Sequence, residues 1–161
     1  ITGPAPVIKE IIEVLNQEDS PLLQWMVPRP EAEEDWYNWN IQNWGTKWDI
    51  CDVYFENPPE EDTIEFSFCS AWGPPEQAFE TWAQADGRVQ FNLEYWEPGM
   101  GFVGSLNYDG EYIDQNYVDS GQDPVGYKEL ASAVWGYEEY DEPEPLTEWY
   151  KQGVEDKGLD K

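Results

Sequence analysis

The sequence predicts an α+β fold in which helices pack on one face of an antiparallel sheet. Apolar residues recur at helical spacing in two segments, and β-branched and aromatic residues fill several short segments bounded by Asn, Pro and Gly. These two kinds of segment alternate in an order that suits layered packing. The chain has 161 residues, of which 40% are hydrophobic and 16% aromatic. It is long enough to bury a core and too aromatic to be intrinsically disordered.

The first four residues, Ile1 to Pro4, are typical of the end of a strand that leads into a helix. We therefore expect the sequence to begin inside a first strand, with a helix over 6–17 directly after it. Its inward face is predicted to carry Val7, Ile8, Ile11, Val14 and Leu15. The following segment, 18–34, holds three prolines and predicts a long loop without regular structure.

The middle of the chain predicts a short helix, a hairpin and a second helix. Residues 35–48 hold four tryptophans, and Asp35 and Gly45 suit the start and the end of a short helix. Residues 49–56 and 63–72 flank a polar link and predict an antiparallel hairpin. The second helix is expected to begin after Gly73-Pro74-Pro75 and to run to about residue 85. Its inner face would carry Ala78, Phe79 and Trp82.

Two more strands are predicted over 88–97 and 101–108, with a short extra strand at 111–113. Together with the expected first strand, the order is strand, helix, strand, strand, helix, strand. This is the split βαβ topology of a ferredoxin-like sandwich. We expect that domain to cover 1–113. Residues 114–161 would form an acidic extension on or beside it, with helices near 125–137 and 146–152.

Four motifs carry a resemblance to a known family. The segment Asn43-Trp44-Gly45-Thr46-Lys47-Trp48 resembles the NWGTKW segment of the ferredoxin-like domain family of phage and plasmid proteins typified by YubB. Weaker similarities lie at 28–31, 71–75 and 97–104, in the family's order. They span roughly residues 1–113. The resemblance implies the fold and a mobile-element setting. It assigns no catalytic residue, because the family has no assigned molecular function.

The two cysteines are predicted to lie apart. In a regular hairpin, Cys51 shares a face with Val53 and Phe55, whereas Cys69 lies on the other kind of face with Glu65 and Ser67. The thiols would then point to opposite sides and could not form a disulfide. Two unpaired cysteines suit a reducing cytosol. With two cysteines and no histidine, we expect no metal site.

The charge balance is strongly acidic, with 35 Asp and Glu against 8 Lys and Arg and a net charge of −27. Such a surface excludes direct binding to nucleic acid and to anionic membranes, since both require basic residues. It would attract a basic protein, such as one that binds nucleic acid. The carboxylates expected to form a partner-binding face are Asp109, Glu111, Asp114, Asp119, Asp123, Glu138, Glu139, Asp141, Glu142 and Glu144.

The tryptophan segment permits two interpretations. Its side chains could be core scaffold, or they could line an aromatic groove for a peptide or a base. The residues concerned are Trp36, Trp39, Asn43, Trp44, Lys47 and Trp48. Because basic residues are so few, we expect Lys47 to pair with a nearby carboxylate.

The leading hypothesis is a non-enzymatic accessory protein of a phage or plasmid, located in the bacterial cytoplasm, that binds a basic partner. In its most concrete form it is a nucleic-acid mimic that inhibits a host defence or replication protein. A virion or assembly component with Trp-rich docking surfaces is an alternative. A carboxylate-dependent hydrolase is a third, although the chain has no histidine and no phosphate-binding or nucleophile motif. A solvated acidic surface that serves solubility or a salty cytoplasm remains the plainest explanation. No cofactor is expected.

Overall fold

The computed structural model describes residues 1–136 and shows an α+β fold built from antiparallel strands and helices. Its helices are α1 (Ala5–Leu15), α2 (Leu22–Met26), α3 (Trp36–Asn43), α4 (Glu76–Asp86) and α5 (Pro124–Trp135). Its strands are β1 (Cys51–Phe55), β2 (Phe66–Cys69), β3 (Phe91–Glu97), β4 (Phe102–Tyr108) and β5 (Ile113–Asp119). The predicted fold class is confirmed. The helix expected at 146–152 lies outside the described residues.

The strands form a two-stranded sheet, β1-β2, and a three-stranded sheet, β3-β4-β5. Residues 1–3 lie between the two sheets. Thr2 makes antiparallel bridges to Thr63, just before β2, and to Gln90, just before β3. Including this short segment, the order across the molecule is β1, β2, residues 1–3, β3, β4, β5. The first strand predicted from Ile1 to Pro4 is thus reduced to a short central segment, in which Thr2 makes isolated bridges only.

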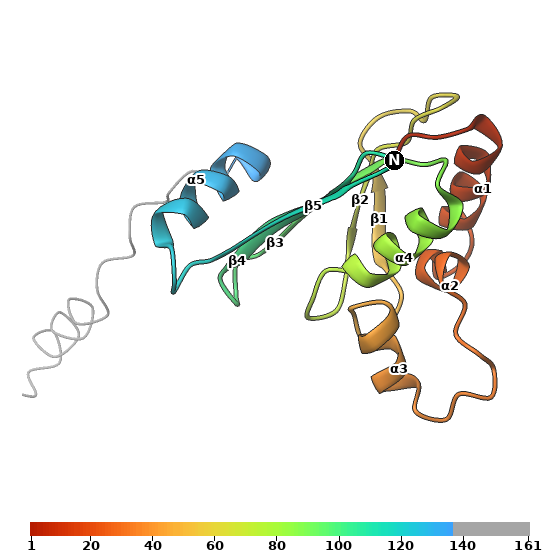
Figure 1. Cartoon of the computed structure of the whole chain (residues 1–161), viewed down its shortest axis with the longest axis horizontal. Coiled ribbons are helices and arrows are strands. Elements are labelled where there is room, and N and C mark those ends of the chain that lie inside the picture. The colour runs from red at the N-terminus through yellow and green to blue at the C-terminus, as the bar shows by residue number, and fades with distance from the viewer. Residues whose placement is uncertain (137–161) are drawn as a thin grey trace, which may run out of the picture.

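The main core lies under one face of the strands, where α1, α2 and α4 pack (Figure 1). In α1 all five residues predicted to face inward are buried. In α4 the predicted inner face is also buried, and Gly87 ends the helix in the left-handed conformation at φ 65°. Periodicity and end signals therefore located both helices correctly, because an apolar stripe needs only a surface to pack on.

The helix α2 corrects the prediction of an irregular loop over 18–34. Pro21 precedes the helix and Pro28 follows it, so neither removes a hydrogen bond from its interior. The Asp49 carboxylate accepts the backbone N–H groups of Leu23 and Gln24 at 2.8 and 2.9 Å. That cap comes from a residue far along the chain, so local sequence carries no sign of it.

The strand β5 begins at Ile113, where the short strand predicted at 111–113 was expected to end, so that prediction placed it too early. It pairs with β4 along its whole length, from Ile113 opposite Tyr108 to Asp119 opposite Phe102. The sheet therefore continues past the domain boundary expected after residue 113. The helix α5 then packs on the opposite face of this sheet from α4, through Val103, Tyr127 and Ala131. Figure 1 shows it at the far end of β3–β5.

Candidate functional site

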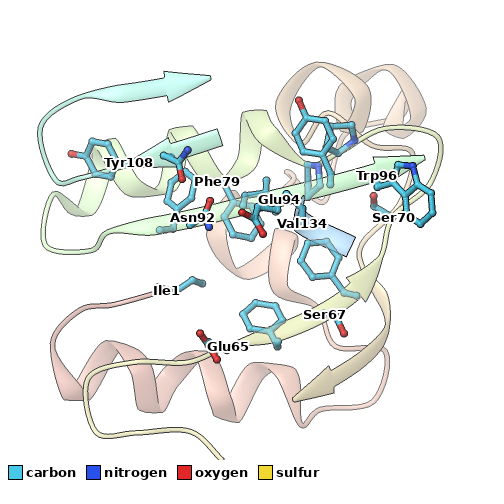
Figure 2. A pocket seen from close by; sticks show the side chains of 18 of the residues that line it. Ile1, Glu65, Ser67, Ser70, Phe79, Asn92, Glu94, Trp96, Tyr108 and Val134 are labelled. Carbon is cyan, nitrogen blue, oxygen red and sulfur yellow. The ribbon is translucent and has the colours of Figure 1, made fainter. Parts of the chain in front are cut away.

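A groove of about 1040 Å³ lies between β2 and β3 (Figure 2). Ile1 enters it at one end, where the terminal amino group donates to the Ile64 carbonyl oxygen at 2.9 Å. Burial lowers the pKa of that amino group. Val134 and Trp135 of α5 are also among the lining residues. Ile1 and Thr2 line the groove. The groove therefore lies where a central strand between β2 and β3 would run.

The side chains of the groove divide by strand parity. Residues Phe91, Leu93 and Tyr95 of β3 are buried toward the main core, whereas Asn92 and Glu94 between them are exposed. Phe66 and Phe68 of β2 pack against the main core, so the same rule leaves Ser67, and Glu65 just before the strand, on the open side away from the helices. Apolar side chains thus line the bottom of the groove, and polar side chains line its rim.

The charged side chains in the groove lining are all acidic within the described part of the chain. They are Glu56, Glu65, Glu94, Glu97 and Asp109. Glu65 accepts a hydrogen bond from the Asn57 amide at 2.7 Å, and Glu97 accepts one from the Gly99 backbone at 2.8 Å. A surface of this kind attracts cations, and its field extends over about a Debye length, roughly 8–10 Å.

The predicted acidic face is only partly assembled. Asp109, Glu111 and Asp114 lie at one end of β5, and Asp119 and Asp123 lie at and beyond the other end. A seven-residue strand separates such groups by roughly 20 Å. The other predicted carboxylates, Glu138, Glu139, Asp141, Glu142 and Glu144, lie outside the described residues.

Three of these carboxylates also have local structural roles. Asp109 accepts the backbone N–H groups of Glu111 and Tyr112, and these bonds lower its pKa. Asp119 accepts from the Gly121 N–H at 2.8 Å, and Asp123 caps α5 by accepting from the Gly126 N–H at 2.9 Å. Turn and cap chemistry therefore accounts for part of the acidity of this segment.

The tryptophan segment is core scaffold in part, as one of the two interpretations predicts. Trp44 is buried, and its indole N–H donates to the Val27 carbonyl at 2.8 Å. Trp39 packs edge-on against it, and the Asn43 amide donates to the Trp39 carbonyl. Trp36 and Trp48 are exposed and line a second hollow of about 630 Å³. The middle of the segment, with Trp39 and Trp44, therefore packs on the core, whereas Trp36 and Trp48 at its two ends lie at the surface.

The six-residue motif 43–48 has a structural explanation. Gly45 has φ 86°, and a Cβ there would meet the Pro74 carbonyl oxygen at 2.8 Å. The buried Thr46 hydroxyl both donates to the Ala71 carbonyl and accepts from the Ala71 N–H, each at 2.9 Å. The motif joins the loops on either side of the hairpin, so its residue types follow from packing.

Lys47 does not form the predicted ion pair within the described residues. Its ammonium lies 4.7 Å from the Trp48 ring centroid and 5.9 Å from that of Tyr37. Such cation–π contacts stabilise by about 0.5–1 kcal/mol at exposed sites. The aromatic rings of this segment, rather than a carboxylate, therefore hold the Lys47 ammonium in place.

Sequence reasoning missed the carboxylates at the rim of the groove, above all Glu65 and Glu94. The alternation of Leu93, Glu94 and Tyr95 is the signal from which the outward direction of Glu94 could have been predicted. It carried no sign that β2 and β3 face each other across residues 1–3.

Comparisons with known proteins bear on the fold. A family model described as the ferredoxin-like domain in Api92-like protein matches residues 43–128, which is 86 of the 161 residues. No curated protein matches the chain. No solved structure matches it either. Among residues 1–136, every helix is too short or too polar to cross a membrane. Because the family model covers more than half of its length, the chain belongs to the family of ferredoxin-like domains found in Api92-like proteins.

Proposed function

We propose that this protein binds a basic partner protein through electrostatic attraction, with the groove between β2 and β3 as the centre of the contact. The proposal includes a non-enzymatic role, an origin in a phage or plasmid of the YubB type, and a cytoplasmic location in the bacterial host. In its most specific form, the partner is a nucleic-acid-binding protein whose site this chain occupies as a mimic.

The observation that carries the proposal is the sign of the charge around the groove. Five carboxylates lie among its described lining residues, without a lysine or arginine. The rest of the described chain carries net charge of the same sign. Nine of the 35 Asp and Glu and three of the 8 Lys and Arg lie beyond residue 136. This leaves 26 acidic and five basic residues in the described part.

Four of the five basic residues of this part do little to neutralise the groove. Lys9 pairs with Glu13 and Arg88 with Asp86, each pair on a single element or turn. Arg29 lies over the Trp44 ring and Lys47 over Trp48. At most five of the 26 carboxylates can therefore be compensated in one-to-one pairs. A field of this sign speeds association with a basic partner and weakens steeply in salt.

Binding should be measured with a lysine-rich peptide and with the proteins that the immobilised chain retains from a bacterial lysate. We expect retention to fall sharply when the salt concentration rises from about 0.05 M to about 0.5 M. This roughly ten-fold range includes physiological ionic strength. We also expect duplex DNA to elute the retained protein. Retention that survives both high salt and excess DNA would rule out electrostatic mimicry.

A matched pair of variants locates the contact. Glu65→Gln/Glu94→Gln removes two charges from the groove. Glu31→Gln/Glu33→Gln removes the same number from the loop before α3. We expect the groove variant to weaken binding by about ten-fold and the control by less than about three-fold, because short-range attraction exceeds screened long-range attraction. Equal losses would show that the charge acts only as a diffuse, solubilising surface.

A further inference from the structure

The two cysteines lie directly opposite each other across the β1–β2 hairpin. Cys51 is the Cα partner of Cys69, and the next partners are Tyr54 and Ser67. Three steps along β1 therefore match two steps along β2, which defines a β-bulge. Asp52 lies in this bulge with φ 51°, a left-handed conformation that Asp tolerates better than most residues.

The bulge overturns the prediction that the thiols point to opposite sides. If the register of the Tyr54–Ser67 pair continued without a bulge, Cys69 would be the partner of Asp52. The side chains of Cys51 and Cys69 would then point to opposite faces of the hairpin. The extra residue brings them into one pair, and partners in an antiparallel ladder point to the same face. Their Cα atoms should then lie about 4.5–5.5 Å apart, within the range of about 4.4–6.8 Å that a disulfide spans.

Two further observations support the pairing. The Cys51 Sγ lies 3.8 Å from the Cys69 carbonyl oxygen, so this thiol is directed toward β2. Both cysteines are free and exposed. A small disulfide in solution can therefore reach either sulfur.

We propose that Cys51 and Cys69 form a reversible thiol-modification site, which a low-molecular-weight disulfide such as oxidised glutathione converts to an intramolecular cross-strand disulfide. In the first step, one cysteine thiolate attacks a glutathione sulfur, and one molecule of glutathione leaves as the thiol. The second cysteine then attacks the protein sulfur of the mixed disulfide and releases the second glutathione. Two electrons pass to glutathione, and both thiol protons end on the two glutathione molecules.

The surroundings of Cys51 favour slow thiol–disulfide exchange that reaches equilibrium, rather than rapid nucleophilic attack. Burial, the Asp52 carboxylate and Cys69 itself raise the pKa of Cys51. A raised pKa leaves little thiolate at neutral pH, which slows exchange. Cys69 also lines the groove between β2 and β3, so the modification would lie at the edge of that surface. The inference does not depend on what the groove binds.

The test uses the full chain, reduced and then equilibrated anaerobically with mixtures of reduced and oxidised glutathione. We expect a monomer about 2 Da lighter than the reduced protein, with both cysteines protected from alkylation. The equilibrium constant for this product should be at least about ten-fold larger in the folded chain than in urea, because the fold holds the sulfurs together. Closing a loop of this length should also raise the Tm by roughly 5–10 °C.

The controls are Cys51→Ser and Cys69→Ser, which replace exposed side chains and should leave the fold intact. Each should carry one glutathione and show no change in Tm of the size expected for the wild type. Three results would overturn the proposal: a wild-type chain that carries two glutathiones, a covalent dimer as the main product, or an equilibrium constant no larger in the folded than in the unfolded chain.

Discussion

The helix-covered part of the molecule and the distal part of the β3–β5 sheet are held together in different ways. The main core joins α1, α2 and α4 to the strands and contains side chains with almost no exposure, such as Ile8, Ile11 and Leu22. The distal cluster has three buried members, Val103, Tyr127 and Ala131. Burial free energy scales with apolar area, so the two parts should differ strongly in stability.

Two directed contacts orient α5 on the small distal cluster. The Trp96 indole N–H donates to the Tyr127 hydroxyl oxygen at 2.7 Å, and the Trp96 ring stacks on that of Trp135. A contact of this kind fixes orientation more than it adds free energy. We therefore expect α5 to open locally while the main core remains folded.

The largest effect should come from the main core. Ile11→Ala removes a fully buried side chain of α1 and should lower the free energy of unfolding by about 3–4 kcal/mol, measured by urea denaturation. Ile12→Ala makes the same chemical change on the half-buried side of that helix and should cost about 1–2 kcal/mol. Equal losses would mean that α1 is not anchored through its inner face.

A smaller and local effect is expected at the distal cluster. Tyr127→Phe removes the acceptor of the Trp96 indole and should weaken the docking of α5 by about 1–2 kcal/mol. Hydrogen exchange should show faster exchange of α5 amides and unchanged exchange of α1 amides. If both helices respond equally, the two parts unfold as one cooperative unit, and the contrast between them does not hold.

Tyr95, whose side chain belongs to the main core, should give a smaller change, with the opposite sign. Among the described residues, its buried hydroxyl lies near the Glu76 carboxylate without making a well-formed hydrogen bond to it or to any other group. Burial and the Glu76 carboxylate raise its pKa well above the ordinary value near 10. At pH 7, Tyr95→Phe should be neutral or stabilise by up to about 1 kcal/mol, since it removes an unsatisfied polar group.

The same residue predicts a pH effect. Below about pH 10 the hydroxyl is protonated in both the folded and the unfolded chain, so it adds no pH dependence. Above that pH the unfolded chain ionises more readily, and the wild type should lose stability as pH rises. Urea midpoints of the wild type and Tyr95→Phe should therefore diverge above about pH 10. Parallel profiles would contradict a raised pKa.

The smallest effect concerns the turn between β4 and β5. Backbone N–H groups of Tyr112 and Glu111 lower the pKa of Asp109 below its ordinary value near 3.9. Its contribution to stability is thus present above about pH 4 and is lost as pH falls through the lowered pKa. In Asp109→Asn this acid-side loss should be absent, as urea midpoints between about pH 5 and 2 would show. An unchanged acid-side slope would contradict this assignment.

Much of the fold was predictable from local patterns, whereas the candidate site was predictable only in part. Apolar periodicity located α1 and α4, and turn residues located the hairpin. The α2 helix was missed because its cap, Asp49, is remote in sequence. Of the groove, the outward direction of Glu94 could be predicted, but its position opposite β2 could not. That position depends on residues 1–3 joining two sheets.

The sequence by itself determined the fold class, most element positions and the sign of the surface charge, because periodicity, turn chemistry and net charge are local or additive properties. Only the tertiary structure decided which side chains meet. The bulge at Asp52 pairs Cys51 with Cys69, and α5 packs on the face opposite α4. A shift of one residue in register moves a side chain to the other face of a strand. That shift is set by hydrogen bonds to a partner strand, which the local sequence does not contain.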